Sequence, residues 1–472
     1  MATIVVVGGG FCGLGTSLLL ARDGHDITVL ERDDRTVPES ARAAWDSWTR
    51  KGVAQFHQPH NFMPGLRALL EAELPDVQES LRAAGAAKFD LVAALPPFWT
   101  DKAPRPIDDK LWTLTARRPT GEWVLRDAAA REPRLTLRSG VDVESLVAGE
   151  SALDGVPHVA GVTTRGGETL RADLVVDATG RGSKSSKWLA ALGAATPYEE
   201  AEDCGFTYYT RFFRGTMPVP RSGALTPFGT VSLLTLPGDN DTWSVTFYAA
   251  SDDKALRRLR EPDAWSKVAR AFPMHAHWLD GEPITEIVSM SGIVDRYRRF
   301  VVDGRPVATG FVAVADACAC TNPSAGRGLT VGFKHGVQLR DALRETGGDP
   351  LALAERFDEL TEARIAPWVH AQISWDRTRF ATMRALADGR EPPPPRDELA
   401  SGIGALLACM AADPDLFRAG LEYIGTLTPV QEILRRPQVQ TKMAQAAQAV
   451  RASGPPPPLP GPNREQLLAL LN

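Results

Sequence analysis

Three glycines near the start of the chain have the spacing of a phosphate-binding loop. Gly8, Gly10 and Gly13 form a Gly-x-Gly-x-x-Gly pattern directly after the apolar run of residues 3–7. Gly8 would permit a tight turn, Gly10 would let the backbone approach a pyrophosphate, and Gly13 would let the following helix pack closely on the strand. Backbone N–H groups at the start of that helix would then face the phosphates.

An acidic residue supports this interpretation. Glu31 follows a second predicted strand, residues 26–30, about twenty residues after the glycines, where a carboxylate can accept hydrogen bonds from ribose hydroxyls. For Glu31 considered alone, a solvated charge at a strand end is the alternative. Strand, loop, helix, strand and acid in this order indicate dinucleotide binding, and the acid favours FAD or NAD over NADP because it would repel a 2′-phosphate.

Other reactive side chains give weaker signals. His57 and His60 have no carboxylate or cysteine beside them at ligand spacing, so we expect no metal. Cys318 and Cys320 would suit a redox pair, although buried inert thiols are the stronger expectation and a redox role stays open. Five cysteines in a chain of this length indicate reduced thiols rather than a disulfide framework.

Composition narrows the class of protein. A chain of 472 residues is too long for one hydrophobic core, and its net charge of −5 gives no sign of a nucleic-acid surface. The apolar start lacks a basic region before it, which argues against a signal peptide. No apolar run has the length of a membrane span. We therefore expect a cytoplasmic enzyme with no nucleic-acid partner and no membrane span.

The elements that would position these residues alternate between strand and helix patterns. Residues 40–60 have no clean period and predict a long loop, whereas the pattern of 64–84 predicts a helix. Further along, a helix is predicted at 119–130, strands at 135–137 and 141–146, and a hairpin at 159–170. Buried strands before Asp177 and Asp316 are each followed by glycines, and a helix runs from about residue 329 to 343.

The middle of the chain changes character. Residues 205–213, 229–236 and 242–250 alternate with period two, which predicts antiparallel strands with a hairpin turn at 237–241. Such a sheet would be a natural cover for a substrate pocket. Packing alone is the alternative, because Phe206, Tyr208 and Phe212 would line a core equally well. Residues 89–112 look strand-like and broken by prolines, and the chain beyond 349 looks helical, with polyproline connectors at 392–395 and 454–461.

The order of the three glycine motifs resembles the FAD-dependent monooxygenases of the p-hydroxybenzoate hydroxylase fold. The motifs are Gly8 to Gly13 with Glu31, then Asp177-Ala-Thr-Gly180, then Asp316 with Pro323-x-x-Gly326-x-Gly328. The stretch from Arg50 to Gln55 and the motif around Asp177 are also similar to bacterial natural-product tailoring flavoenzymes, including polyketide and polyether epoxidases. The resemblance extends to about residue 345.

Two departures from the family pattern stand out. Ala315 replaces the usual glycine before Asp316, and the middle motif is Asp-Ala-Thr-Gly rather than Asp-Gly. The second departure argues against direct reduction by NADPH. The same form also occurs in geranylgeranyl-reductase-like proteins and flavin halogenases, but the halogenase Trp-x-Trp-x-Ile-Pro signature is missing.

The resemblance implies roles for individual residues. Asp316 would bind ribityl hydroxyls, Pro323 would lie near flavin C4a, and the helix starting after Gly326 would point at the N1–C2 edge of the ring. Arg118 would reach the FAD phosphates. The full set of expected cofactor residues is Gly8, Gly10, Gly13, Glu31, Arg32, Arg50, Lys51, Val53, Arg118, Val143, Asp316, Pro323, Gly326, Gly328 and Leu329. No catalytic acid or base is assigned.

The predicted fold is α/β: a Rossmann-like FAD-binding domain with an inserted antiparallel substrate sheet and a helical C-terminal region. We expect the FAD-binding domain at 1–88, 114–200 and 290–345, the substrate domain at 89–113 and 201–289, and the helical region with its proline-rich linkers at 346–472. Aromatic residues of the inserted parts are the expected substrate pocket, namely Phe98, Trp99, Trp112, Tyr208, Tyr209 and Phe212. Alternation allows only one of the two adjacent tyrosines to line it.

The predicted function is an FAD-dependent monooxygenase that epoxidises or hydroxylates a hydrophobic natural-product intermediate, as in antibiotic biosynthesis. The resemblance implies use of O₂ through a flavin C4a-(hydro)peroxide, with NAD(P)H or a separate flavin reductase as electron donor. Two alternatives are an FAD-dependent C=C reductase or dehydrogenase of the geranylgeranyl-reductase type, and an FAD-scaffolded cyclase without redox change. Substrate, regiochemistry and oligomeric state are left open.

Overall fold

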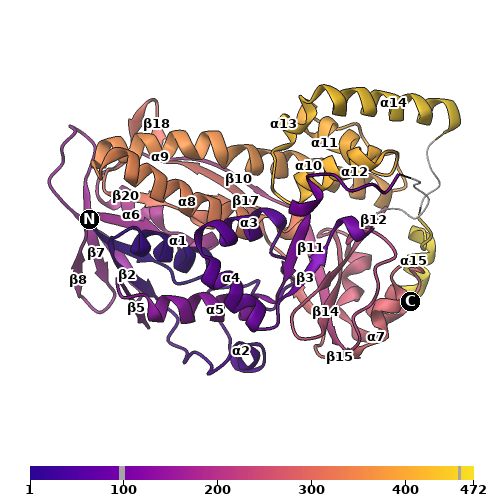
Figure 1. The fold of residues 1–472 in the computed structure, drawn as a ribbon, viewed down its shortest axis with the longest axis horizontal. Coiled ribbons are helices and arrows are strands. Elements are labelled where there is room, and N and C mark those ends of the chain that lie inside the picture. The colour runs from indigo at the N-terminus through magenta and orange to yellow at the C-terminus, as the bar shows by residue number, and fades with distance from the viewer. Residues whose placement is uncertain (95–100, 455–458) are drawn as a thin grey trace.

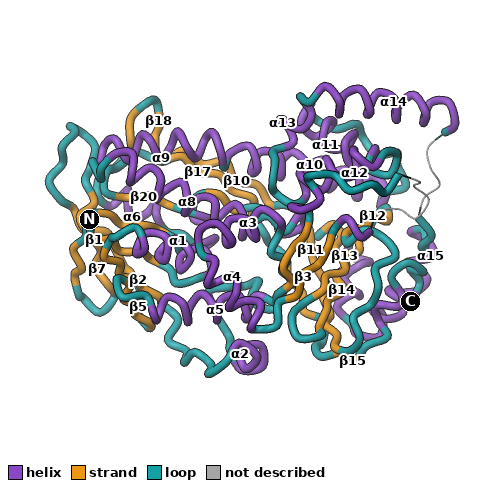
Figure 2. The backbone as a smooth tube through the Cα atoms, viewed as in Figure 1, coloured by secondary structure: helices purple, strands orange, loops and turns teal. Residues whose placement is uncertain are grey.

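The computed structural model describes residues 1–94, 101–454 and 459–472, and its elements are drawn in Figure 1. Phe98, Trp99 and the connector residues 455–458 lie outside the described residues. Strands form two main groups in Figure 2, a parallel sheet near the N-terminus and an antiparallel sheet beside the C-terminus. The predicted α/β architecture is confirmed.

The parallel sheet has five strands in the order β20-β9-β1-β2-β5. Their bounds are β1 Thr3–Val7, β2 Asp26–Glu31, β5 Leu135–Ser139, β9 Leu174–Asp177 and β20 Phe311–Ala313. Strand β1 is buried on both faces, as continuous apolar runs in parallel sheets are. Ile4 and Val6 belong to one hydrophobic core, and Val5 and Val7 belong to another.

Different elements cover the two faces of this sheet. Helices α1 (Phe11–Arg22), α5 (Arg118–Arg131) and α8 (Gly328–Thr346) supply the core around Ile4 and Val6. A three-stranded sheet of β6 (Val143–Ala148), β7 (Val159–Thr164) and β8 (Thr169–Arg171), with α6 (Ser185–Ala191), covers the other face. Both faces of the sheet are therefore covered, and the carboxyl ends of its strands remain accessible.

Three local predictions were wrong in detail. The expected loop at 40–60 contains helix α2 (Ala41–Ser47), whose first turn is capped by Ser40 Oγ accepting from Ala43 N at 3.1 Å. The expected single helix at 64–84 is two helices, α3 (Pro64–Glu73) and α4 (Pro75–Ala83), because the ring of Pro75 cannot continue the first. Between 87 and 115 the only regular strands of the described residues are β3 (Ala87–Asp90) and β4 (Trp112–Thr115).

The antiparallel sheet has the strand order β12-β13-β14-β11-β15, and β16 also pairs with β11. Its bounds are β11 Phe206–Arg214, β12 Leu225–Phe228, β13 Val231–Pro237, β14 Thr242–Ala250, β15 Glu282–Pro283 and β16 Val288–Met290. Trp243, Val245 and Phe247 face a core shared with α7 (Pro262–Arg270) and α15 (Arg464–Leu471). The opposite, polar face is buried as well.

A third sheet connects these two parts. Strands β10 (Tyr198–Asp203), β17 (Val294–Arg299) and β21 (Ala319–Cys320) pair antiparallel, and helix α10 (Ala366–Ala387) packs beside β17 and β21. Helix α9 (Pro350–Arg364) is joined to β17 by side-chain hydrogen bonds to Tyr297 and Arg299. β18 (Val301–Val302) and β19 (Arg305–Pro306) form a short hairpin.

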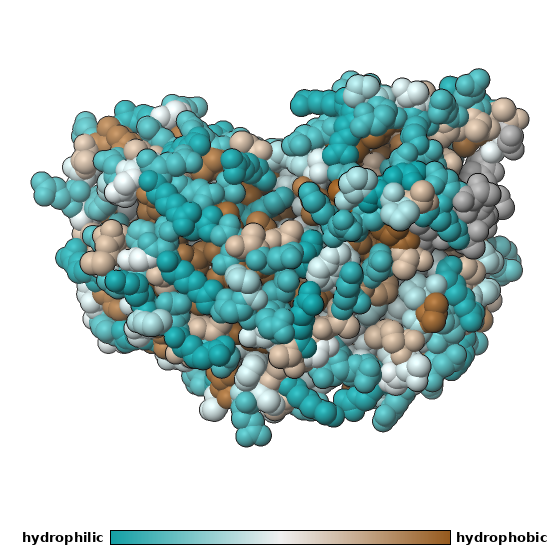
Figure 3. All heavy atoms as spheres, viewed as in Figure 1, coloured by the Kyte–Doolittle hydropathy of each residue, from teal (hydrophilic) through white to brown (hydrophobic). Residues whose placement is uncertain are grey.

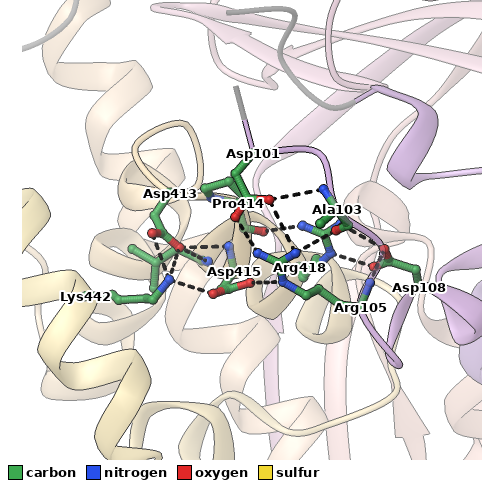
Figure 4. Close-up of polar contacts among 10 residues, drawn as sticks. Asp101, Ala103, Arg105, Asp108, Asp413, Pro414, Asp415, Arg418 and Lys442 are labelled. Atoms are coloured by element: carbon green, nitrogen blue, oxygen red, sulfur yellow. Dashed lines mark hydrogen bonds and ion pairs between the residues drawn. The ribbon is translucent and has the colours of Figure 1, made fainter. Parts of the chain in front are cut away.

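The helical region comprises α11 Glu398–Cys409, α12 Pro414–Ile424, α13 Val430–Leu434 and α14 Pro437–Ser453. It is tied to residues 101–108 by a network of charged side chains around Arg418, seen in Figure 4. Hydrophilic residues cover most of the face shown in Figure 3, with the apolar ones scattered. Among the described residues, none of the helices is apolar over a length that would cross a bilayer.

Candidate active site: a dinucleotide cavity

One large cavity opens at the carboxyl ends of β1, β9 and β20. It encloses about 1570 Å³ of empty space, a figure that includes its open mouth. Every expected cofactor residue lines it except Lys51, whose side chain is exposed. Residues from three distant parts of the chain therefore converge on one space.

The three glycines of the first loop have different surroundings. Gly8 has φ +110°, and a Cβ there would lie 2.5 Å from Ala178 O. A Cβ on Gly13 would lie 2.1 Å from Gly8 O, so this glycine is required by the packing of α1 on the loop. A Cβ on Gly10 would meet nothing within 4 Å, because it would project into the cavity itself. The free space above Gly10 is what a bound pyrophosphate needs.

A buried charge network lies behind this loop. Glu31 Oε2 accepts from Gly9 N at 2.9 Å and from Arg50 Nη2 at 2.5 Å. Arg50 Nη1 also donates to Glu122, which receives a second bond from Arg118 Nε at 2.6 Å. Glu122 is fully buried, and although burial alone would raise its pKa, Arg118 and Arg50 hold that pKa below its ordinary value. Glu122 was missed in the sequence because nothing adjacent to it marks its role.

The middle motif shapes the cavity wall. Asp177 is fully buried and accepts from Thr179 N at 2.9 Å, Thr179 Oγ1 at 2.6 Å and Ser183 Oγ at 2.5 Å. These bonds hold the turn that places Gly180, Arg181 and Lys184 along the cavity. Asp177 therefore acts as the structural anchor of this turn.

A buried hydroxyl and a carboxylate face the cavity where α8 begins. The hydroxyl of Thr321 is buried and has no hydrogen-bond partner among the described residues. A Cβ on Gly328 would lie 4.0 Å from both Thr321 Oγ1 and Asp316 Oδ1, so the two oxygens flank the start of α8. Burial raises the pKa of Asp316, and Arg181 and Arg118 oppose that rise. This donor and acceptor set fits a polyhydroxylated chain such as the ribityl group of FAD.

The alanine that replaces the family glycine adopts a left-handed conformation. Ala315 has φ +52°, and its N–H donates to His335 Nδ1 at 3.3 Å. Its methyl group is accommodated by Gly332, where a Cβ would lie 2.8 Å from Ala315 Cβ. The chain thus tolerates a side chain at this turn because the neighbouring helix has none.

The aromatic residues expected to line a substrate pocket lie elsewhere. Tyr209 packs into the core beside α7, and Tyr208 faces the other way, where its OH donates to Asn322 Oδ1 at 2.5 Å. Phe212 contacts Trp45 with ring centroids 4.7 Å apart, and Trp112 stacks under the Arg67 guanidinium at 4.2 Å. None of these four lines the cavity, so their contact with substrate stays a prediction.

Several residues that line the cavity were not singled out as pocket residues from the sequence. They are Pro59, Asn61, Met290, Ile293 and Thr321, together with His60. His60 Nδ1 lies 2.9 Å from Gln58 O, and burial with help from Arg118 lowers the pKa of His60 to about 3. The ring is therefore neutral and cannot act as a cationic partner at neutral pH.

Residues 3–145 match the sequence model of the family described as FAD dependent oxidoreductase. A 6-methylpretetramide 4-monooxygenase of Streptomyces rimosus is 24% identical over 409 residues, covering 81% of this chain and 86% of that protein.

Two solved structures have the same fold. One is PqsL, a probable FAD-dependent monooxygenase from Pseudomonas aeruginosa, with TM-score 0.60, 15% identity, and coverage of 82% of this chain and 97% of that chain. The other is the Diels-Alderase PyrE3 of pyrroindomycin biosynthesis, with TM-score 0.58, 18% identity, and coverage of 90% and 80%. At these identities the likeness establishes the fold.

Proposed function

Because residues 3–145 match the FAD dependent oxidoreductase family and the fold is that of flavin monooxygenases, we propose that the chain is an FAD-dependent monooxygenase that hydroxylates or epoxidises a hydrophobic natural-product intermediate with O₂. The observation that carries this proposal is the single cavity on which all three glycine motifs converge. Likeness to a 6-methylpretetramide 4-monooxygenase supports a monooxygenase reaction on a natural-product intermediate.

The residues that would hold FAD follow from the cavity. Gly10 and the N-terminus of α1 would receive the pyrophosphate, with Arg118 as the nearby cation. Asp316 and Thr321 would bind the ribityl hydroxyls, and Pro323 and Gly326 would border the flavin ring. Bound FAD supplies the activated oxygen, while the chain orients the substrate and excludes water.

Substrate would enter between the cavity and the antiparallel sheet. We propose that residues 1–88, 114–200 and 290–345 form the FAD-binding domain. Residues 89–113 and 201–289 would form the substrate domain and cover the flavin side. Met290 and Ile293 offer apolar contact at the cavity end, and burying apolar surface at about 25 cal/mol per Å² would supply most of the affinity. We further place the enzyme in the cytoplasm, with NAD(P)H or a flavin reductase supplying electrons.

An isotope experiment tests the reaction. Under ¹⁸O₂ the product should gain one heavy oxygen, and an anaerobic incubation should give no product. Unlabelled product of unchanged oxidation state, formed equally fast without oxygen, would instead indicate the cyclase, which the likeness to PyrE3 makes the second candidate. Product carrying two additional hydrogens would indicate the C=C reductase.

A further inference from the structure

Two carboxyl groups meet beneath the turn that borders the proposed flavin end of the cavity. Asp295 comes from β17 and Asp376 from α10, and their residues are 2% and 3% exposed. Asp295 Oδ1 accepts from Asn322 N at 2.5 Å, and Asp376 Oδ2 accepts from Gln372 Nε2 at 2.8 Å. The two carboxyls also hydrogen-bond each other, and Gln372 Nε2, which donates to Asp376, lies 3.3 Å from Ser324 Oγ of the same turn.

A hydrogen bond between two carboxyl groups requires a proton, because an ionised carboxylate only accepts. Burial, together with the neighbouring Asp376, raises the pKa of Asp295 to about 8. Burial likewise raises the pKa of Asp376, against the hydrogen bond from Gln372. At neutral pH the pair therefore holds one proton, and both groups lose it together as one coupled site.

The surroundings provide little positive charge. Arg327 is the cation that lowers the pKa of Asp376, and it is itself engaged with Gln372 Oε1 at 3.2 Å and Tyr423 OH at 3.0 Å. Glu202 adds negative charge on the side of Asp295, and Arg377 pairs with Glu202 at 2.5 Å. Other titratable or charged groups near the pair or near its neighbours include Asp203, Cys204, Tyr208, Tyr248, Cys320, Arg181, Arg296, Asp316 and Arg379.

The pair is directly connected to the cavity wall. Asn322, fully buried, receives bonds from Tyr208 OH at 2.5 Å and Ser324 N at 3.4 Å while its own N–H goes to Asp295. Its neighbours Thr321 and Pro323 line the cavity. Any displacement of Asn322 therefore moves the part of the wall that would touch the flavin ring.

We propose that Asp295 and Asp376 are positioning residues whose shared proton holds the Asn322–Ser324 turn against the flavin end of the cavity, so that loss of this proton at alkaline pH weakens FAD binding. The inference rests on the proposed position of FAD. Two adjacent buried negative charges repel each other and the pair must then separate or admit water, which displaces the turn.

The sign of the effect follows from the raised pKa values. The folded protein keeps a proton that the unfolded chain releases above about pH 4, so this site contributes stability that is lost as pH rises through the folded pKa. If FAD binds the protonated form, its dissociation constant should rise above pH 8 by at most about tenfold per pH unit.

The test compares the wild type with Asp295→Asn. The amide introduced by this substitution can donate to Asp376 in place of the shared proton, and its oxygen can still accept from Asn322 N, so the turn is held at every pH. We expect the FAD dissociation constant, measured by fluorescence quenching from pH 6 to 9, to rise in the wild type and to stay flat in D295N. Asp253→Asn removes a carboxylate paired with Arg464 at 2.7 Å in the substrate domain and should keep the wild-type profile. A wild-type profile in D295N would overturn the inference.

A second measurement does not depend on FAD. Infrared difference spectra of the protein without added flavin, between pH 6 and 9, should show loss of one protonated carboxyl in the wild type and none in D295N. The double variant D295N/D376N should also show none, which keeps the test open if D295N is unstable. A wild type without this carboxyl signal overturns the shared proton, whereas a wild type that shows it but never binds FAD overturns the proposed function instead.

Discussion

At the scale of single residues, the glycines of the first loop allow folding and cofactor binding to be separated. Gly10→Val should abolish FAD binding and leave the helical content unchanged, because the side chain would enter only the cavity. Gly13→Ala should instead lower the free energy of unfolding by about 1–3 kcal/mol, since its methyl group would overlap Gly8 O. Flavin release on denaturation and circular dichroism measure the two effects. Normal FAD content in G10V would contradict the assignment of this loop to the pyrophosphate of FAD.

A buried histidine at the second loop predicts an acid limit to stability. Burial lowers the pKa of His335 to about 3, and its Nδ1 accepts from Ala315 N while Nε2 lies 3.0 Å from Thr361 Oγ1. The unfolded chain binds a proton near pH 6.5, so unfolding becomes easier as pH falls from about 6.5 toward 3, by at most about 1.4 kcal/mol per pH unit for this group.

His335→Gln should reduce that slope by about one proton, measured by urea denaturation at pH 7 and pH 4.5. The exposed His370→Gln is the matched control and should keep the full slope. An unchanged slope in H335Q would assign the acid sensitivity to other groups.

At the scale of elements, one arginine joins the helical region to the segment after β3. Arg418 on α12 donates through Nε and Nη2 to both oxygens of Asp108, at 2.6 and 2.8 Å, and also to Ala103 O (Figure 4). The Arg418 side chain is 3% exposed, so its bonds are protected from water. Arg418→Ala should lower the free energy of unfolding by about 3 kcal/mol.

Limited proteolysis should show faster cleavage near residues 101–111 in R418A. Arg390→Ala removes an exposed pair with Asp388 and should change stability by less than about 1 kcal/mol. Equal effects of the two substitutions would contradict the anchoring role of Arg418.

The elements also show what the sequence could and could not predict. The two units of strand, glycine loop and helix, one containing Gly13 and the other Gly328, could be predicted because the residues that mark them are adjacent in the sequence. The roles of Glu122 and of the pair Asp295 and Asp376 could not, since their partners come from distant segments and no periodic pattern marks a buried charge. Alternation along β11 correctly predicted that neighbouring residues lie on opposite faces of the strand. Whether a face contacts the cavity or a helix could not be predicted, because it depends on how other elements pack against the strand.

At the scale of the whole molecule, the chain end stabilises the substrate sheet. Leu467 and Leu471 of α15 are 1% and 3% exposed and belong to the core that contains Trp243 and Trp265. Leu467→Ala should cost about 2–5 kcal/mol of stability. FAD content should be unchanged, because this core does not border the cavity. Calorimetry and released flavin measure the two quantities, and loss of FAD in L467A would contradict their independence.

The whole architecture also predicts which electron donor reduces the bound FAD. Both strand–glycine loop–helix units, at β1 and at β20, contribute to the same cavity, so one FAD would occupy them both and neither remains for a nicotinamide cofactor. The turn around Asp177 is held by Thr179 and Ser183 and lines that same cavity. We therefore expect NAD(P)H alone to bleach the flavin absorption slowly in stopped-flow measurements, with acceleration by bound substrate or by an added flavin reductase. Dithionite is the control for a reducible flavin, and fast bleaching by NAD(P)H without substrate would contradict this prediction.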